Sequence, residues 1–458
     1  MPSLKKITEA IFTAPAETLE KTLEVVEKEE VAIINKKPFK AAEEYLQTLG
    51  PGLTTGAADD DPSGIATYSQ TGAQYGFQLL WLSLFTFPFM ALVQEMCARI
   101  GMVTGKGLAA NIRTHFPRKI LYFITGLLFV ANTLNIAADL GAMAASMRLI
   151  FPGIGILVYA GFFGIIILLL QIFTTYARYA KVLKYTALAL LSYVFTAFAV
   201  HLNWGDAIAH TVIPSITFSK GQIFLICAIL GTTISPYLFF WQTSQEVEEE
   251  ILKGEVTIKQ RQQGVTEQGL KSAKTDVWSG MFVSNLVMFF IIAACAATLH
   301  AHGITDIATA DQAAAAIRPF GGELTYFFFA IGIIGTGMLA VPVLAGSTAY
   351  AISESFGWKQ GLYRKLKEAY AFYGVIIVSM ILGFILNLIH IDPIKGLIYS
   401  AVANGLIAPV ILFFIVKISS NHVVMGAHTN RKFTTIAGWL IMGLMTIAGI
   451  AAIGSMFI

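Results

Sequence analysis

Apolar stretches of about 20 residues recur along this chain of 458 residues, and they constrain its fold more than any other feature. Only 13% of the residues are charged, against about 25% in ordinary soluble domains, and the mean hydropathy is +0.68. Stretches of this length and composition are typical of α-helices that cross a lipid bilayer. The sequence therefore predicts an all-α membrane protein with many spanning helices.

Eleven transmembrane helices are predicted, nine strongly apolar and two less so. The two weaker spans are 46–75 and 221–244, and both contain proline, glycine and polar residues. The nine strong spans are 79–103, 120–147, 155–174, 183–201, 275–300, 325–351, 369–390, 393–416 and 434–458.

Lysine and arginine residues predict which side of the membrane each turn faces. With the N-terminus inside, the outer turns hold only Arg148, Lys220, Arg318 and Lys395, whereas every inner turn holds several basic residues. Because cytoplasmic loops carry an excess of Lys and Arg, we expect a cytoplasmic N-terminus and an external C-terminus in the cell (inner) membrane. Residues 1–43 are expected to form a cytoplasmic tail and residues 44–458 the membrane domain.

Proline beside small polar residues interrupts both weaker spans near their middles, at Asp61-Pro62-Ser63-Gly64 and at Ser235-Pro236. Proline lacks an N–H group and disfavours helix just before it, so main-chain carbonyls are freed there. The interrupted spans are the first and the sixth. Such paired breaks indicate a five-plus-five inverted-repeat transporter with its site at the repeat interface. We expect repeats at about 44–203 and 220–418, and an extra helix at 434–458.

Three consecutive aspartates, Asp59, Asp60 and Asp61, precede the first break. A charged side chain at bilayer depth costs roughly 2.5–3.5 kcal/mol on insertion scales, so it faces a partner or a water-filled cavity. Negative charge, freed carbonyls and water access together predict a cation site, with Asp59 and Asp60 lining the aqueous approach. An external loop between two shorter helices is the alternative interpretation.

Other polar residues within apolar sequence allow more than one interpretation. Asp139 in the third span fits a proton relay, a contact to the ion's water, or a cap on a broken helix, and Asn404 in the tenth span is similarly open. A glutamate run predicts a solvated helix end rather than a site; it comprises Glu246, Glu248, Glu249 and Glu250. Residues 101–107 only approximate a phosphate-binding loop, and no enzyme motif is present, so we expect no enzymatic activity.

The two breaks and the third span resemble the NRAMP family of divalent-metal transporters. The resemblance is close over the first three helices, good at the sixth, and weak from about residue 325 onward. It implies a LeuT-like fold with an ion bound between the first and sixth helices. The segments that carry it are Gly50-Pro51-Gly52, Asp61-Pro62-Ser63-Gly64, Thr71-Gly72-Ala73-Gln74-Tyr75-Gly76-Phe77, Gly101-Met102-Val103-Thr104-Gly105, Ala138-Asp139-Leu140 and Gly231-Thr232-Thr233-Ile234-Ser235-Pro236-Tyr237.

The resemblance implies a metal site formed by the Asp61 carboxylate, the Ser235 hydroxyl and backbone carbonyls near Ala58 and Thr232. Several positions depart from the family pattern: the Asn ligand is Gly64, the Met ligand is Ser235, two His positions are Tyr237 and Gln242, and the third-helix Glu is Ala142. Thioethers favour soft metals, whereas oxygen ligands suit Mg, Ca and Mn. The reduced ligand set resembles that of NRAMP-related magnesium transporters, which accept a partly hydrated ion.

We therefore expect an importer of Mg²⁺, and in second place Mn²⁺, that works by alternating access with little or no proton coupling. Its expected partners are the divalent ion and the lipid bilayer, with no cofactor and no nucleic acid. Three alternatives stay open: a proton-coupled Mn²⁺/Fe²⁺ importer, a Na⁺-coupled carrier of a small organic solute, and a non-transporting metal sensor. The aspartates beside the break argue against an anionic solute.

Overall fold

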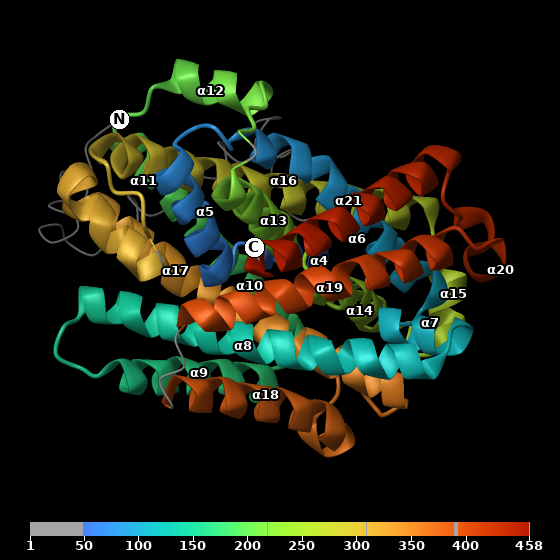
Figure 1. Cartoon of the computed structure of the whole chain (residues 1–458). Coiled ribbons are helices and arrows are strands. Elements are labelled where there is room, and N and C mark those ends of the chain that lie inside the picture. The colour runs from blue at the N-terminus through green and yellow to red at the C-terminus, as the bar shows by residue number, and fades with distance from the viewer. Residues whose placement is uncertain (1–48, 218, 308, 389–392, 458) are drawn as a thin grey trace, which may run out of the picture. The chain divides into compact units, whose positions relative to one another are not determined.

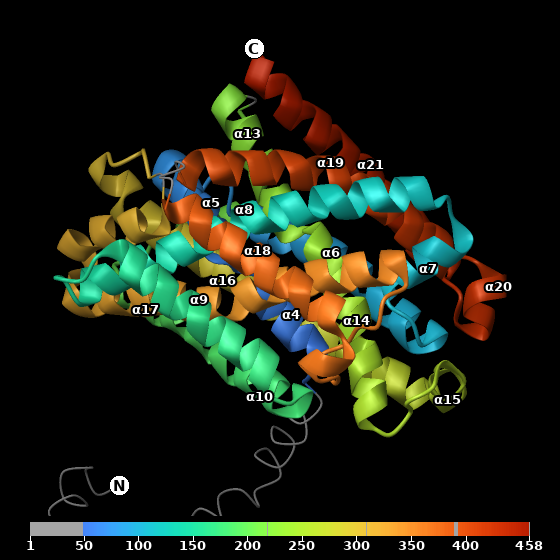
Figure 2. The ribbon, with the colours of Figure 1, turned by 90° about the horizontal axis from the view of Figure 1, so that it is seen from below.

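The computed structural model describes residues 49–217, 219–307, 309–388 and 393–457. The chain divides into two units, residues 1–49 and Gly50–Ile458, and the predicted tail 1–43 lies outside the described residues. Throughout the described part of the second unit the regular structure is helical, without a β-strand (Figures 1 and 2). The predicted all-α fold is confirmed.

The long helices follow the predicted order of spans. They are α4 (Pro51–Asp59), α5 (Pro62–Tyr75), α6 (Trp81–Thr104), α8 (Arg118–Ile150), α9 (Ile156–Phe173), α10 (Tyr176–Thr186) with η1 (Ala187–Leu190) and α11 (Leu191–Ala199), α13 (Lys220–Thr233), α14 (Pro236–Leu252), α16 (Glu267–Thr298), α17 (Ala310–Phe356), α18 (Tyr370–Leu388), α19 (Pro393–Ser419) and α21 (Lys432–Phe457). The connections carry α7 (Leu108–His115), α12 (Trp204–Val212), α15 (Ile258–Gly264), η2 (His300–His302), η3 (Leu366–Glu368), α20 (His422–Met425) and η4 (Gly426–His428).

Nine helices in the described ranges are long and apolar enough to cross a membrane, or ten if a bent pair near residue 420 counts as one span. The α4–α5 pair is not among them. The exact number of eleven spans therefore stays a prediction.

Both predicted helix breaks are confirmed at the predicted prolines. Helix α4 ends at Asp59 and α5 begins at Pro62, while α13 ends at Thr233 and α14 begins at Pro236. The residue before each proline is extended, because a following proline disfavours helical backbone there. Proline in turn suits the first helical position, where no N–H partner is needed.

The helices form two groups that enclose these breaks. Helix α16 contacts α4, α5 and α6, and α14 contacts α4 and α6. Helices α8, α9 and α18 pack against one another, as Figure 1 shows, and α17 contacts members of both groups. Members of both groups therefore contact the broken helices, α8 through its contacts with α5 and α14.

Glycines let α4 approach α16 at backbone contact. A Cβ atom on Gly56 would lie 2.2 Å from the carbonyl oxygen of Gly280, and one on Gly280 would lie 2.1 Å from that of Gly52. Small residues permit such close helix packing in membrane proteins. The seventh span therefore fixes the position of the half-helix that leads to the aspartates.

The outer surface of the bundle is apolar. On α9 and α21 the large exposed side chains include Phe162, Ile165, Leu169, Phe173, Leu440, Ile447 and Ile450. A helix that is apolar on its exposed side as well as its packed side is typical of a membrane span. This surface fits the lipid bilayer expected from the sequence.

Candidate metal site at the helix breaks

Asp61 is held in a fixed orientation at the N-terminus of α5. Its Oδ1 atom accepts hydrogen bonds from the Gly64 N–H at 2.7 Å and from the Ser63 hydroxyl at 2.6 Å. The side chain is buried, and the positive end of the helix dipole stabilises its negative charge. Neither bond uses Oδ2, so the carboxylate keeps acceptor capacity for an ion.

Neutral oxygen atoms from both breaks form a hydrogen-bonded network. The Tyr237 hydroxyl on α14 donates to the Ala58 carbonyl on α4 at 3.0 Å. The Ser235 hydroxyl donates to the carbonyls of Thr232 and Gly231. Because a carbonyl or hydroxyl oxygen has two lone pairs, each of these atoms keeps one for a further contact. The predicted neutral ligands thus remain available as oxygen donors.

Gly64 stands directly beside the carboxylate. A Cβ atom here would lie 3.4 Å from Asp61 Oδ1 and 3.3 Å from the Asp59 carbonyl oxygen. The side chain of a larger residue at position 64 would therefore occupy the space next to the Asp61 carboxylate.

Three further aspartates are buried near the first break with few partners. The Ser284 hydroxyl donates to Asp59 Oδ2 at 3.3 Å. Asp59 Oδ1 and both carboxylate oxygens of Asp60 and Asp139 accept no hydrogen bond from the part of the chain that the structure describes. Asp139, on α8, also interacts electrostatically with Asp61. Burying anionic oxygens without partners is costly, so this cluster favours a bound cation, a proton or water.

The other sequence-predicted residues lie farther along the helices. Gln242 donates to Glu246 at 2.8 Å, and the Asn404 side-chain oxygen is buried without a donor among the described residues. Asp59 and Asp60 are 1% and 0% exposed. Their role in an aqueous approach stays a prediction. Among the described residues, no three His, Cys, Asp or Glu side chains converge as metal ligands.

Two cavities lie among the described helices, and the first adjoins the site. The first, of about 330 Å³, is lined by Pro62 and Ser63 of α5, Ala142 of α8, Asp311 of α17 and Asn387 of α18. It lies on the side that the basic residues predict to be external, and we call it the outer cavity. Ser63, which bonds Asp61, forms part of its wall.

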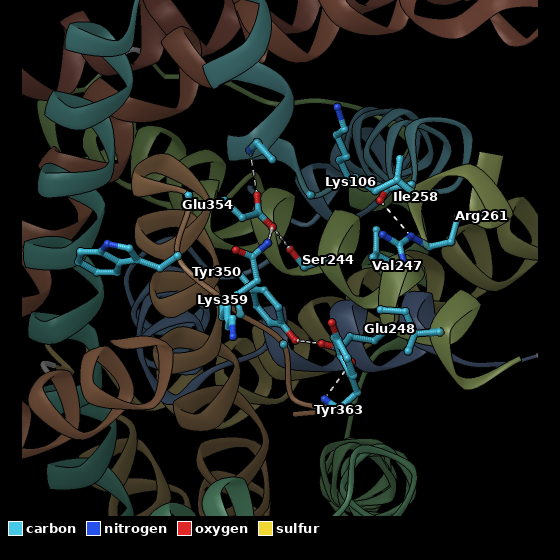
Figure 3. Close-up of a pocket in the computed structure, with 18 of the residues that line it drawn as sticks. Lys106, Ser244, Val247, Glu248, Ile258, Arg261, Tyr350, Glu354, Lys359 and Tyr363 are labelled. Carbon is cyan, nitrogen blue, oxygen red and sulfur yellow. Dashed lines mark hydrogen bonds between the residues drawn. The ribbon is translucent and has the colours of Figure 1, made fainter. Parts of the chain in front are cut away.

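The second cavity, of about 290 Å³, lies between α7, α14 and the end of α17, on the predicted cytoplasmic side (Figure 3). We call it the inner cavity. Glu354 in its wall accepts from the Ala110 N–H and the Ser244 hydroxyl, and Glu248 accepts from the Tyr350 hydroxyl. Its basic lining residues are Lys106, Arg113, Arg261, Lys359 and Arg364.

The prediction of a solvated glutamate run is wrong. Glu246, Glu248 and Glu250 are 6%, 1% and 5% exposed. Besides the Tyr350 hydroxyl, the N–H groups of Leu362 and Tyr363 donate to Glu248. These donors lie over 100 residues away in sequence, so the charge pattern alone could not reveal them.

Asp276 is an important residue that the sequence reasoning missed. It lies at the start of the seventh span on α16 and accepts bonds from the N–H groups of Gly50, Gly52 and Leu53. An acidic residue entering an apolar run was a visible signal, but its partners lie more than 220 residues away.

Two broken helices whose breaks meet at a buried carboxylate define the class of membrane transporters with a LeuT-like fold. The chain belongs to the family described as Natural resistance-associated macrophage protein-like, whose model matches residues 52–455. It is 27% identical over 435 residues to the "Divalent metal cation transporter MntH" of Klebsiella pneumoniae (strain 342), covering 92% of this chain and 97% of that protein. The family resemblance is thereby confirmed, and the chain is a multi-pass membrane transporter rather than an enzyme.

Solved structures show the same fold. The Eremococcus coleocola manganese transporter, in complex with an aromatic bis-isothiourea compound, superposes with a TM-score of 0.71 at 16% identity, over 90% of this chain and 87% of that one. A nucleobase-cation-symport-1 family transporter in a closed conformation gives 0.56 at 14% identity, over 88% and 90% of the two chains. These likenesses concern the fold alone.

Proposed function

We propose that this divalent metal cation transporter imports Mg²⁺, and in second place Mn²⁺, by alternating access across the cell membrane. Its N-terminus lies in the cytoplasm and its C-terminus outside, an orientation supported by the distribution of lysine and arginine. Uptake runs on the metal gradient and the membrane potential with little or no proton coupling.

The cluster of buried carboxylates with few hydrogen-bond partners at the first break is the observation that carries this proposal. Asp61 is oriented by two hydrogen bonds and keeps one oxygen outside them. Asp59, Asp60 and Asp139 add buried carboxylate oxygens that no described residue satisfies. A divalent cation is the substrate whose charge offsets such a cluster, and Asp61 is its principal charged ligand.

The neutral atoms at the breaks favour a hard ion. Ser235 offers a hydroxyl, and Ala58 and Thr232 offer carbonyl oxygens, all of which suit Mg²⁺ and Mn²⁺ better than soft metals. Mg²⁺ dehydrates reluctantly and usually keeps several waters. A short ligand set beside a cavity of about 330 Å³ supports binding of a partly hydrated ion.

Residues at the family's proton-carrying positions support uncoupled transport. The Tyr237 hydroxyl donates to Ala58, Gln242 donates to Glu246, and neither Gln242 nor Ala142 has a titratable group. The membrane potential supplies about 2.3 kcal/mol per charge per 100 mV, or about 4.6 kcal/mol for a divalent ion. That energy corresponds to roughly 2,000-fold accumulation without any proton movement.

Flux into proteoliposomes tests this proposal. Mg²⁺, Mn²⁺ and Ca²⁺ entry are compared under a potential clamped with K⁺ and valinomycin, with a pH dye in the lumen. We expect voltage-dependent Mg²⁺ entry without proportional acidification, and loss of entry in Asp61→Ala but not in Asp306→Ala, a variant of an exposed aspartate.

Three results would each contradict a different part of the proposal. Near-normal uptake by Asp61→Ala at equal reconstitution would remove Asp61 as the ligand. Entry of Mn²⁺ with no entry of Mg²⁺ would make manganese the substrate. Acidification in fixed proportion to metal entry would establish proton coupling and make Asp139 the first carrier to test.

A further inference from the structure

The outer cavity has the charge expected of a cation site. Among its described lining residues Asp311 is the only charged side chain, and there is no lysine, arginine or histidine. The inner cavity, by contrast, is lined by five basic side chains, and its two glutamates are already bonded to protein donors. A cation is therefore attracted to the outer cavity and repelled from the inner one.

Asp311 is a partly buried charge at the wall of the outer cavity. It lies in the first turn of α17, two residues after the capping Thr309. Burial raises the pKa of the Asp311 carboxyl above its ordinary value, while the Thr309 hydroxyl and the charge of Arg148 act in the opposite direction. A nearby cation would offset the cost of keeping this carboxylate ionised.

Asn387 supplies a neutral oxygen to the same cavity. Its Nδ2 atom donates to the carbonyls of Ala137 at 2.8 Å and Gly383 at 3.1 Å, which fixes the orientation of the amide. These two bonds use only Nδ2, so the Oδ1 atom of Asn387 can accept a hydrogen bond from a water in the cavity. A Cβ atom on Gly141, which also lines the cavity, would lie 2.8 Å from that oxygen. Glycine therefore keeps the space in front of Asn387 Oδ1 free.

The size of the cavity matches a hydrated ion. Six waters at about 30 Å³ each occupy about 180 Å³, less than the cavity's 330 Å³ or so. Its wall reaches Ser63, whose hydroxyl bonds Asp61. Ser63, in the first turn of α5, therefore connects this cavity with the Asp61 carboxylate.

We propose that Asp311 and Asn387 form a second, outer site that holds a hydrated divalent cation through its water ligands before the ion reaches Asp61. This inference rests on the proposed function and on the orientation that places the start of α17 outside. The outer site concentrates the ion at the entrance, so it lowers the KM for metal and leaves kcat to the site at the breaks.

Uptake by intact cells that express the full chain tests this site, because the orientation is uniform there. Initial rates are measured with Mg²⁺ and separately with Mn²⁺ for Asp311→Asn, Asp311→Glu and Asp311→Lys. Asp306→Asn removes the same charge from the connection just before α17, at an exposed residue that does not line the cavity.

We expect Asp311→Asn to raise KM about sevenfold. This factor corresponds to the loss of about 1.2 kcal/mol of attraction between one carboxylate and a divalent ion through water at about 7 Å. Asp311→Lys raises KM further, Asp311→Glu stays near the wild-type value, and kcat is unchanged in all three. Asp306→Asn leaves KM unchanged.

The inference is overturned by an unchanged KM in Asp311→Asn, by an equal rise in Asp306→Asn, or by a fall in kcat alone. Its failure is distinct from failure of the proposed function. A KM shift seen with Mn²⁺ in a protein that does not carry Mg²⁺ supports the outer site and rejects magnesium. Normal Mg²⁺ uptake with no KM shift in Asp311→Asn supports magnesium transport and rejects the outer site.

Discussion

One carboxylate, that of Asp276, attaches α4 to α16, and the free-energy cost of removing it can be estimated from its hydrogen bonds. Asp276 Oδ1 accepts from the N–H groups of Gly50 at 2.8 Å and Leu53 at 3.0 Å, and Oδ2 accepts from Gly52 at 2.7 Å. The substitution Asp276→Asn keeps the shape of the side chain but replaces one oxygen by an NH₂ group. At least one of the three backbone N–H groups then faces this NH₂ group, which is also a donor, and loses its hydrogen bond.

The expected cost follows from the kind of bond that is lost. A hydrogen bond to a charged group contributes about 1.5–3 kcal/mol, and an unsatisfied buried donor costs about 1–3 kcal/mol. Loss of one such bond and weakening of the other two gives about 2–4 kcal/mol for Asp276→Asn. The equilibrium between attached and detached α4 should therefore shift by about 30- to 1,000-fold towards detachment.

Alkylation of a buried cysteine on α4 measures this shift. Thr55 is 0% exposed, so Thr55→Cys, in a background without Cys97, Cys227 and Cys295, reacts only when α4 opens. Asp276→Asn should accelerate its reaction with a maleimide by at least about 30-fold, and the exposed control Thr275→Ala should not. An unchanged rate in Asp276→Asn would refute the role assigned to this carboxylate.

Three further perturbations have defined outcomes. Ser235→Met combined with Gly64→Asn should shift transport preference from Mg²⁺ towards Mn²⁺ and Cd²⁺, measured as competitive flux. The reason is that a soft thioether replaces the hard hydroxyl of Ser235, and an amide is added at Gly64, which has no side chain. Gly56→Ala should destabilise the protein by about 1–3 kcal/mol in thermal unfolding, because its Cβ would lie 2.2 Å from the Gly280 carbonyl oxygen. Glu248→Gln should speed tryptic cleavage at Lys359, because the Leu362 and Tyr363 N–H groups lose a charged acceptor.

Matched variants separate these effects from general damage. Gly126→Ala adds the same methyl group where no atom lies within 4 Å, so it should leave the melting temperature unchanged. Glu323→Gln alters an exposed glutamate near the other end of α17 and should not affect tryptic cleavage at Lys359. An unaltered Mg²⁺-to-Cd²⁺ preference in the folded double variant would place selectivity outside Ser235 and Gly64.

The helix breaks were predictable because proline acts on its own neighbours. Pro62 and Pro236 restrict the preceding residue and lack an N–H group, and both effects are local in sequence. The structure accordingly ends α4 and α13 three residues before the respective proline. The all-helical membrane fold was predictable for a similar reason, since span length and apolar composition are also local.

Partnerships between distant residues were not predictable in this way. Glu248 is written in the sequence as part of a charged run, yet donors over 100 residues away make it a buried helix-to-loop contact. The Gly52–Gly56 spacing signals close helix packing, but nothing in the chain names α16 as the partner. Exposure of a charged residue depends on such donors, so composition alone gives the wrong answer here.

The candidate site combines both kinds of information. The sequence identifies Asp61 and Ser235 because each stands beside its proline. Their value as ligands depends on bonds that only the fold reveals: Ser63 and Gly64 engage one oxygen of Asp61, and Tyr237 donates to the Ala58 carbonyl across 179 residues. That last bond joins the two broken helices through an atom proposed to contact the ion. Movement of α4 relative to α14 would therefore change the coordination of the metal and the contact between the helices together, which is the coupling that alternating access requires.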